Sequence, residues 1–284
     1  MKLVANNYGK GRVRVAKVIR DGEWHVYKNY TVQITLEGDV SAAYVAGDNA
    51  LVLPTDTMKN STYAIAATHD FSSPEQFGLD LSARFLATAP HLTSAQIEIE
   101  EQMWKRMVFD GEVHNHAFMG NSSERRTASI KRTHEGVSIE SGIKEMYILK
   151  TTGSAFVGFF RDEYTILPEE TDRIMATNLT ATWCLKDAGD SAVYNQVWEQ
   201  VRSVLLETFA NHDSESVQHT LYEMGQAVFT AVPQVAEIGM EMPNVHNIPY
   251  NFSLIGIDSK NEVFVPIDEP YGMISGRLRA DDAE

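Results

Sequence analysis

The first half of the chain contains the sequence RVRVAKVIRDGEWHVYKNYTVQITL at residues 12–36. Apolar and polar side chains alternate over residues 12–19 and again over residues 30–36. Alternation with a period of two is typical of a strand that has one buried face. Asp21-Gly22, between the two runs, is a turn signal. The stretch therefore predicts a long antiparallel hairpin.

The segments that follow this hairpin predict two helices and two further strands. Residues 55–67 are predicted to form a helix. Thr55, Asp56 and Thr57 are all suitable as its N-cap. Residues 74–87 read as a second helix, because a proline occupies its first turn and Phe77, Leu81 and Phe85 recur every four residues. The two strands are predicted at 94–108 and 123–134.

The second half of the chain repeats the same order of elements. Strands are predicted at 138–150 and 176–185, helices at 193–210 and 216–231, and closing strands at 235–242, 250–257 and 262–266. A repeat of this kind indicates two similar half-domains, residues 1–135 and 136–284. It predicts an α+β fold in which helices are segregated on one face of antiparallel sheet.

Composition limits the classes of partner. The chain has 284 residues, of which 43% are apolar and 22% charged, as in an ordinary folded domain. A net charge of −15 at pH 7 disfavours nucleic acid as a partner. Arg125, Arg126, Lys131 and Arg132 form a small basic cluster, for which we expect a solvated strand face.

The sequence also suggests a compartment. Cys184 is the single cysteine, which excludes an intrachain disulfide and suits a reducing environment. No apolar run approaches the roughly 18 residues that a membrane span needs. A signal-peptide stretch and a C-terminal Ser-Lys-Leu peroxisomal address are missing, so we expect a cytoplasmic location.

Common cofactor and metal motifs are missing from the sequence. It contains no GxGxxG after a strand, no P-loop, no CxxC and no HExxH. His114 and His116 would share one face of a strand and meet one ion there. Two ligands alone rarely hold zinc, and no third ligand is close in the sequence, so we predict no metal site.

Several short segments occur together in a distinctive order. They are Tyr8-Gly9-Lys10, Ala46-Gly47-Asp48-Asn49, Pro54–Asn60, Phe156–Tyr164, Glu170-Thr171-Asp172-Arg173, Ser216-Val217-Gln218 and Pro243-Asn244-Val245-His246. In this order and at these separations they resemble the urate oxidase (uricase) family, from Tyr8 to Tyr271-Gly272. The resemblance implies tandem tunnelling-fold (T-fold) half-domains. It further implies that paired chains close their sheets into a β-barrel and that two barrels stack into a homotetramer.

The resemblance also implies how urate, a flat anion, is held. Phe156 matches the ring that stacks under the purine, Arg173 the guanidinium fork, and Gln218 the amide that both donates and accepts. The family's remaining substrate-binding positions are matched by Thr55, Asp56, Val217 and Asn244. In the family, the Thr55 and Asp56 positions come from one subunit, and those of Phe156, Arg173, Val217 and Gln218 from its neighbour.

Helix geometry supports the same positions independently. Thr55-Asp56 and Val217-Gln218 both fall at a predicted helix N-terminus, where free main-chain N–H groups attract anions. Each residue taken alone could also have an ordinary structural role. Arg173 alone would read as a surface ion pair with Asp172 or Glu169, and Thr55 as an ordinary helix cap.

Catalysis in the family uses a Thr–Lys pair with a histidine nearby, which Thr55, Lys10 and His246 match. Lysine acts as a base only when neutral, and burial favours that form. Asn244 matches the amide that binds O2 or the water replacing it. Because the urate dianion can pass an electron to O2 directly, the resemblance implies no flavin or metal, and 5-hydroxyisourate and hydrogen peroxide as products. Pro54 departs from the family, which usually has alanine there.

Two other functions compete with this interpretation. Other T-fold enzymes act on pterins or other purines, usually anchor the heterocycle with a glutamate, and often bind zinc. A non-catalytic protein of the same fold would not need Lys10, Thr55 and His246 together. A peroxide assay with urate separates the three possibilities.

Overall fold

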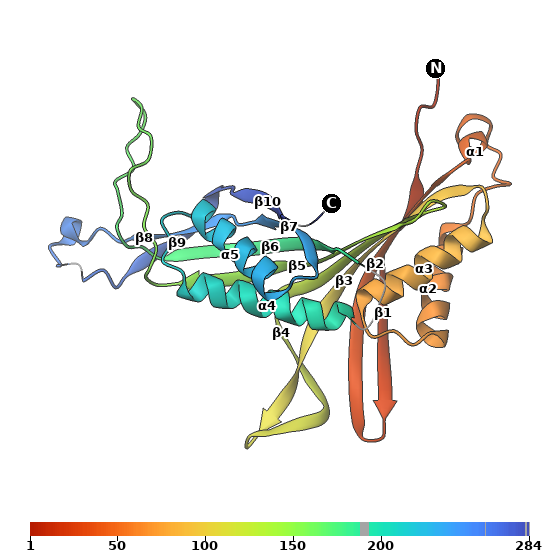
Figure 1. Ribbon diagram of the computed structural model, residues 1–284, viewed down its shortest axis with the longest axis horizontal. Coiled ribbons are helices and arrows are strands. Elements are labelled where there is room, and N and C mark those ends of the chain that lie inside the picture. The colour runs from red at the N-terminus through yellow and green to blue at the C-terminus, as the bar shows by residue number, and fades with distance from the viewer. Residues whose placement is uncertain (188–192, 259, 282, 284) are drawn as a thin grey trace. The chain divides into compact units, whose positions relative to one another are not determined.

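The structure is a computed structural model that describes residues 1–187, 193–258, 260–281 and 283 (Figure 1). The chain divides into two compact units. Met1–Gly142 with Asp187–Trp198 form the first unit, and Ile143–Lys186 with Glu199–Glu284 form the second.

The first unit contains four antiparallel strands in the order β1-β2-β3-β4. Their bounds are Tyr8–Asp21 for β1, Trp24–Gly38 for β2, Leu92–Phe109 for β3 and Glu112–Thr133 for β4. The predicted hairpin is confirmed, with Val15 opposite Tyr30. Strand β1 starts earlier than predicted, because a register shift between Lys10 and Val13 interrupts the alternation there.

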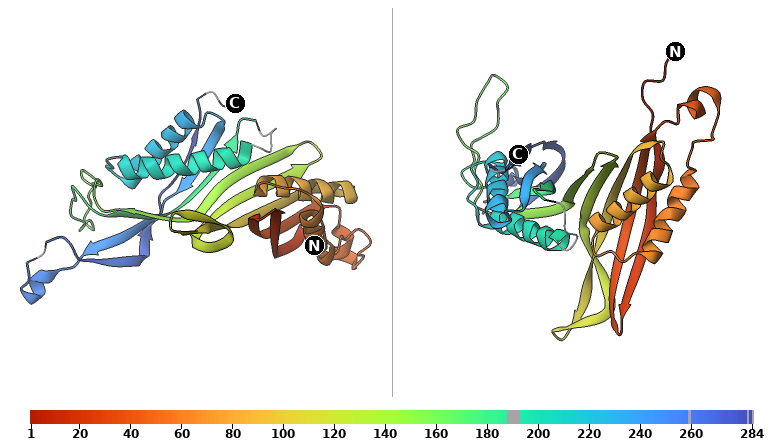
Figure 2. Two further views of the ribbon diagram at one scale, coloured as in Figure 1. Left: turned by 90° about the horizontal axis from the view of Figure 1, so that it is seen from below. Right: turned by 45° about the vertical axis from the view of Figure 1, so that its right-hand side comes forward.

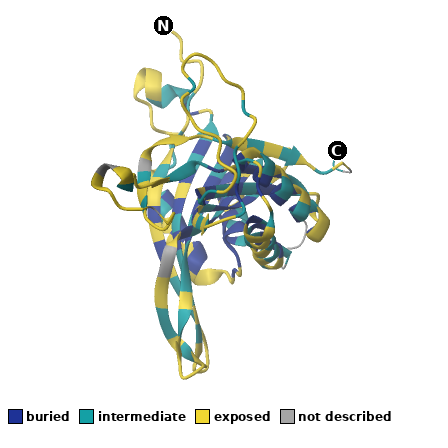
Figure 3. Cartoon of the chain, turned by 90° about the vertical axis from the view of Figure 1, so that its left-hand side faces the viewer, coloured by how far each residue is buried: buried dark blue, intermediate teal, exposed yellow. Residues whose placement is uncertain are grey.

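Helices cover one face of these strands (Figure 2). They are α2 (Thr55–Thr68), which packs on β1, and α3 (Pro74–Thr88), which packs on β3 and β4. Their apolar side chains and those of the strands form a core in which Phe77, Leu81 and Ile97 are fully buried. Figure 3 colours buried residues dark blue. The short α1 (Ser41–Ala46) was not predicted, and it buries none of its residues.

The starts of α2 and α3 differ in how they are capped. Ser73 caps α3, because its Oγ accepts a hydrogen bond from the N–H of Gln76 at 3.2 Å. The prediction of a cap within Thr55–Thr57 is wrong. The N-cap of α2 is Pro54, with φ −56° and ψ 138°, and no side chain caps this helix. Among the described residues, no side chain therefore accepts a capping hydrogen bond at the start of α2.

The expectation that the basic cluster is solvated is wrong for Arg126, which is only 4% exposed. Its Nη2 lies 2.7 Å from Oε2 of Glu75, a completely buried residue in the first turn of α3. The other oxygen of that carboxylate accepts a hydrogen bond from Ser141 Oγ at 2.7 Å, and Arg126 Nη1 donates to Asn195 Oδ1 at 2.6 Å. Position 126 faces a carboxylate 51 residues away, which no local pattern reveals.

The second unit combines an antiparallel sheet with two helices. Strand β6 pairs with β7, which pairs with β10, and β6 also pairs with β8, which pairs with β9. Helix α5 packs on β7 and β10. The bounds are Met175–Leu185 for β6, Val217–Ala231 for α5, Val235–Glu241 for β7, Asn244–Pro249 for β8, Phe264–Gly272 for β9 and Ser275–Arg279 for β10. Strand β5 (Val137–Lys150) and helix α4 (Val193–Asn211) each run from the first unit into the second.

The predicted strand at 250–257 is wrong. This segment contains a 3-10 helix, η1 (Phe252–Ile255), which starts where Asn251 Oδ1 accepts the N–H of Ser253 at 3.1 Å. It ends at Gly256, whose φ of 71° lies in the left-handed region. Strands β8 and β10 were not predicted. No helix in the described ranges is both long and apolar enough to cross a membrane.

Candidate active site

Lys10 lies on β1 in the first unit, where the strand is held close to its neighbours. The hydroxyl of Tyr8 accepts a hydrogen bond from the N–H of Leu53 at 3.0 Å, which ties the segment before α2 to this strand. At Gly9 the backbone comes so close to β2 that an added Cβ would lie 1.8 Å from the carbonyl oxygen of Ile34. Glycine is the residue that permits this approach, so the backbone next to Lys10 is tightly positioned.

The N-terminus of α2 lies within electrostatic reach of Lys10. Thr55 is the first residue of the helix, and Asp56 follows it. Hydrogen bonds from Lys59 and Asn60 lower the pKa of the Asp56 carboxyl, and the charge of Lys10 acts weakly in the same direction. The first unit therefore brings together Lys10, Thr55 and Asp56, three of the predicted site residues.

Three segments of the second unit are joined by main-chain hydrogen bonds. They are the segment around Phe156, the segment that ends at Arg173, and the residues just before α5. The bonds run from Ala155 N–H to the Ser214 carbonyl (2.7 Å), from Phe156 N–H to the Glu170 carbonyl (2.7 Å), and from Arg173 N–H to the Ser154 carbonyl (2.8 Å). Phe156, Arg173 and the start of α5 are thus held in one frame.

Asp172 strengthens this frame in a way that the sequence did not predict. Its carboxylate accepts hydrogen bonds from Thr152 Oγ1 at 2.6 Å and from the N–H of Gly153 at 2.8 Å. The bond from Thr152 is the main cause that lowers the pKa of Asp172. The surface ion pair considered for Arg173 is not found among the described residues. Thr152 lies 20 residues before Asp172, so no local signal points to their contact.

Arg173 and Phe156 lie against each other. The guanidinium carbon of Arg173 is 5.2 Å from the centroid of the Phe156 ring, and Phe159 stacks on that ring at 4.8 Å with an angle of 10°. Burial lowers the pKa of Arg173, and the charge of Glu170 opposes this effect. The Nε–H of Arg173 is buried and has no acceptor among the described residues. A buried donor of this kind is suited to an acceptor on a ligand.

A cavity of about 410 Å³ opens beside Arg173. Asn244 and His246 both line it from β8. Strand β8 pairs with the start of β6, just after Arg173, with Ala176 opposite Val245. Apolar side chains supply much of the remaining wall, namely Leu167, Pro168, Ile174, Ile248, Pro249 and Phe264. The second unit therefore brings three predicted residues to one largely apolar cavity.

The other two predicted residues of this unit begin α5. Val217 is buried and Gln218 is exposed. Ser216 caps the helix, because its Oγ accepts the N–H of His219 at 3.1 Å. The predicted site residues thus fall into two groups, with Lys10, Thr55 and Asp56 in the first unit and the rest in the second.

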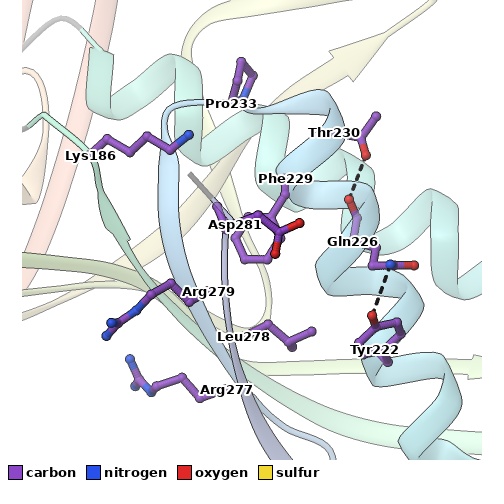
Figure 4. Close-up of a pocket in the computed structure, with 11 residues that line it drawn as sticks. Lys186, Tyr222, Gln226, Phe229, Thr230, Pro233, Arg277, Leu278, Arg279 and Asp281 are labelled. Atoms are coloured by element: carbon purple, nitrogen blue, oxygen red, sulfur yellow. Dashed lines mark hydrogen bonds between the residues drawn. The ribbon is translucent and has the colours of Figure 1, made fainter. Parts of the chain in front are cut away.

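A larger cavity, of about 750 Å³, lies between α5 and β10 (Figure 4). It contains none of the predicted site residues. Two of its cationic groups are already engaged, because Arg277 and Arg279 both lie within 2.8 Å of the Glu237 carboxylate. We therefore place the candidate site at the smaller cavity, next to Arg173.

His114 and His116 stand two residues apart on β4. Their rings contact each other edge to face, with centroids 4.6 Å apart. Within the described ranges, no group of three or more His, Cys, Asp or Glu side chains is arranged to hold a metal ion.

Comparisons with known proteins agree with these features. A family model described as Uricase matches residues 6–131 and 139–275. The uricase of Arthrobacter globiformis is 39% identical over 274 residues, which cover 96% of this chain and 88% of that protein. The uricase of Dictyostelium discoideum is 36% identical over 280 residues, which cover 98% and 97%.

Solved structures show the same likeness. The crystal structure of Arthrobacter globiformis uricase matches with a TM-score of 0.93 at 38% identity, covering 100% of this chain and 96% of that one. That of Bacillus sp. TB-90 urate oxidase matches with a TM-score of 0.86 at 26% identity, covering 97% and 100%. The expected α+β T-fold is thereby confirmed. Matches in sequence and in structure that extend over nearly the whole chain show that it belongs to the uricase family.

Proposed function

We propose that this chain oxidises urate with O2 and water, giving 5-hydroxyisourate and hydrogen peroxide. Membership of the uricase family supports the reaction. The observation that carries the proposal is the half-buried Arg173 guanidinium over the Phe156 ring, at the wall of a cavity shared by Asn244 and His246. Urate loses two electrons and gains a hydroxyl group from water, while O2 takes up two electrons and two protons.

Binding follows from the shape and charge of urate. The purine lies on Phe156, where offset stacking on an aromatic ring is favourable. Arg173 donates to one anionic edge of the purine, because its fork matches two adjacent acceptors. Gln218 donates and accepts on the opposite edge. The first N–H groups of α5, at Val217 and Gln218, have no partner within the helix and add further donors.

Proton transfer is assigned to Lys10, Thr55 and His246. Thr55 passes a proton from urate to Lys10, and His246 relays protons through water. Asn244 binds O2 or the attacking water above the purine plane. The urate dianion is itself the electron donor, so we propose that no cofactor takes part.

We also propose that the site is completed between subunits of a homotetramer. Thr55 and Asp56 of one subunit would face Phe156, Arg173 and Gln218 of its neighbour. The division of the predicted residues between the two units supports this arrangement, as does the presence of a helix N-terminus in each group. The half-domain boundary between residues 135 and 136 stays a prediction.

An oxygen electrode coupled to a peroxide assay tests the proposed function. Purified protein with urate should consume one O2 for each hydrogen peroxide released, and a pterin should give no reaction. Arg173→Ala should weaken urate binding by about 2–5 kcal/mol, the usual cost of removing one partner of a buried charged pair. Arg161→Ala is a matched control, because Arg161 also lies over a ring, 4.7 Å from Phe159, but is about half exposed and lies 4.0 Å from Glu169. Absence of urate-dependent oxygen consumption would overturn the proposal.

A further inference from the structure

We infer that the paired imidazoles of His212 and His219 are positioning residues that make urate binding sensitive to acid. The inference rests on the proposed function, because it concerns how the start of α5 presents Gln218 to urate. Neither histidine belongs to the predicted binding or catalytic set.

The two rings join the end of α4 to the start of α5. His212 directly follows the last residue of α4, and His219 lies in the first turn of α5. Their ring centroids are 4.6 Å apart at an angle of 78°, an edge-to-face contact. The N–H of His219 also makes the capping bond to Ser216 Oγ. Movement of the His219 ring therefore acts directly on the turn that contains Gln218.

The same corner is bonded to the segment that carries Phe156. Ser214, two residues after His212, donates its N–H to the Gly153 carbonyl at 2.9 Å and accepts from Ala155 at 2.7 Å. Close packing reinforces these bonds, since a Cβ added at Gly153 would lie 3.3 Å from Asp213 Oδ1. A displacement of His212 is therefore transmitted to the segment that holds Phe156.

The surroundings of His212 oppose a positive charge on its ring. Burial lowers the pKa of His212, and the nearby charges of His219 and Lys150 lower it further, while Glu223 and Asp213 act in the opposite direction. Lys150 Nζ already donates to the main-chain carbonyl of His212 at the end of α4. A cation is favourable at a helix C-terminus. At the end of α4 this cation is Lys150, so the helix end does not need a positive charge on His212.

The hydrogen bonding of the rings leads to the same conclusion. Nε2 of His212 and Nδ1 of His219 are buried and have no hydrogen-bond partner among the described residues. A protonated imidazole carries a donor on both nitrogens, so a charged ring would leave a buried donor unsatisfied. The outer nitrogen of His219, Nε2, lies 3.7 Å from Glu223 Oε1. The packed pair is thus stable when neutral, and protonation drives the rings apart.

The direction of the pH effect follows from the lowered pKa of His212. Its ordinary value is 6.5, so the corner is intact above about that pH. As the pH falls below 6.5 and through the folded-state pKa, His212 takes up a proton and is repelled by the charge of Lys150. The start of α5 then moves relative to the segment of Phe156, and urate affinity falls.

Anaerobic calorimetry with urate tests the inference, because urate binds without turnover when O2 is absent. The affinity is measured at about pH 7.5 and about pH 5.5, which bracket the range in which histidine titrates. The proteins compared are the parent, His212→Gln, His219→Gln and His69→Gln. His69 is a matched control, because it also directly follows a helix and its carbonyl also accepts a lysine, Lys17, at 2.8 Å. Urate itself takes up protons in acid, so the proteins are compared at the same pH.

For each protein, the affinity for urate at about pH 7.5 is divided by the affinity at about pH 5.5. This ratio should be at least about fivefold larger for the parent and His69→Gln than for His212→Gln or His219→Gln, a coupling typical of linked sites. His219 has a side chain that is 41% exposed, so its substitution is tolerated even where His212→Gln does not fold. Equal acid losses in all the proteins would overturn the inference while leaving the proposed function intact. A parent that binds no urate at about pH 7.5 would overturn the proposed function as well.

Discussion

Replacing Gly9 by alanine tests whether the spacing of β1 from β2 sets the position of Lys10. An added Cβ would lie 1.8 Å from the carbonyl oxygen of Ile34, whereas real Cβ atoms essentially never approach within 3.0 Å. The strand must therefore move away by at least 1.2 Å, the difference between these two distances, and Lys10 moves with it. A displacement of about 1 Å in a catalytic group costs roughly a hundredfold in rate, or about 2.7 kcal/mol of barrier.

Steady-state urate oxidation, with kcat and KM determined separately, measures this loss. Gly11→Ala is the matched control on the same strand, because an added Cβ there meets only Gln33 Oε1, at 3.8 Å. A thermal melt of each variant shows whether the fold is retained. We expect Gly9→Ala to lose about a hundredfold in kcat and Gly11→Ala to stay close to the parent. If kcat of Gly9→Ala stays within a few-fold of the control, the link from strand spacing to Lys10 is refuted.

Four further predictions concern the buried ion pair, the proton relay, the cofactor and the assembly. Glu75→Ala should lower the free energy of unfolding by about 3–5 kcal/mol, because it leaves the charge of Arg126 buried and uncompensated. The double variant Glu75→Leu with Arg126→Met should regain much of this free energy. Denaturant unfolding of the two variants measures both changes. Lys10→Met should cut kcat by about 10²- to 10⁴-fold with urate affinity nearly unchanged, and adding Thr55→Ala should cost little more; losses that simply multiply would contradict a shared relay. Activity should survive exhaustive chelation, and loss on chelation with recovery on adding metal would exclude a cofactor-free reaction. Inactive Thr55→Ala and Arg173→Ala proteins, dissociated and reassembled together, should regain part of the activity, and mixtures that stay inactive would argue against a site shared between subunits.

Periodicity in the sequence predicted most of the fold because the elements concerned each bury one regular face. Residues 12–36 and the helices α2 to α5 are of this kind, and their bounds differ from the prediction by only a few residues. The segment 250–257 misled the same reasoning, since its aromatic and β-branched residues favour a strand. A side chain that bonds its own backbone, Asn251 to Ser253, decided the conformation there instead.

The candidate site was predictable as a set of residue identities, through the family resemblance. Its geometry was not, because the contacts that hold Phe156 and Arg173 join residues far apart in the chain. The bond between Ala155 and Ser214 spans 59 positions and involves only main-chain atoms, which leave no mark on the side-chain pattern. The buried charge of Arg126 escaped prediction for a related reason, since its partner Glu75 lies 51 residues away.

The main-chain frame around Phe156 has a consequence for how specificity can change. Its three hydrogen bonds join only backbone atoms, so they do not depend on the side chains of the six residues that make them, Ser154, Ala155, Phe156, Glu170, Arg173 and Ser214. Exchanging the Phe156 ring or the amide of Gln218 alters the size and polarity presented to a ligand, while the backbone that carries them keeps its hydrogen bonds. Directed evolution toward other flat, anionic heterocycles should therefore start at these side chains and leave Asp172 unchanged, since its carboxylate bonds to Thr152 and Gly153.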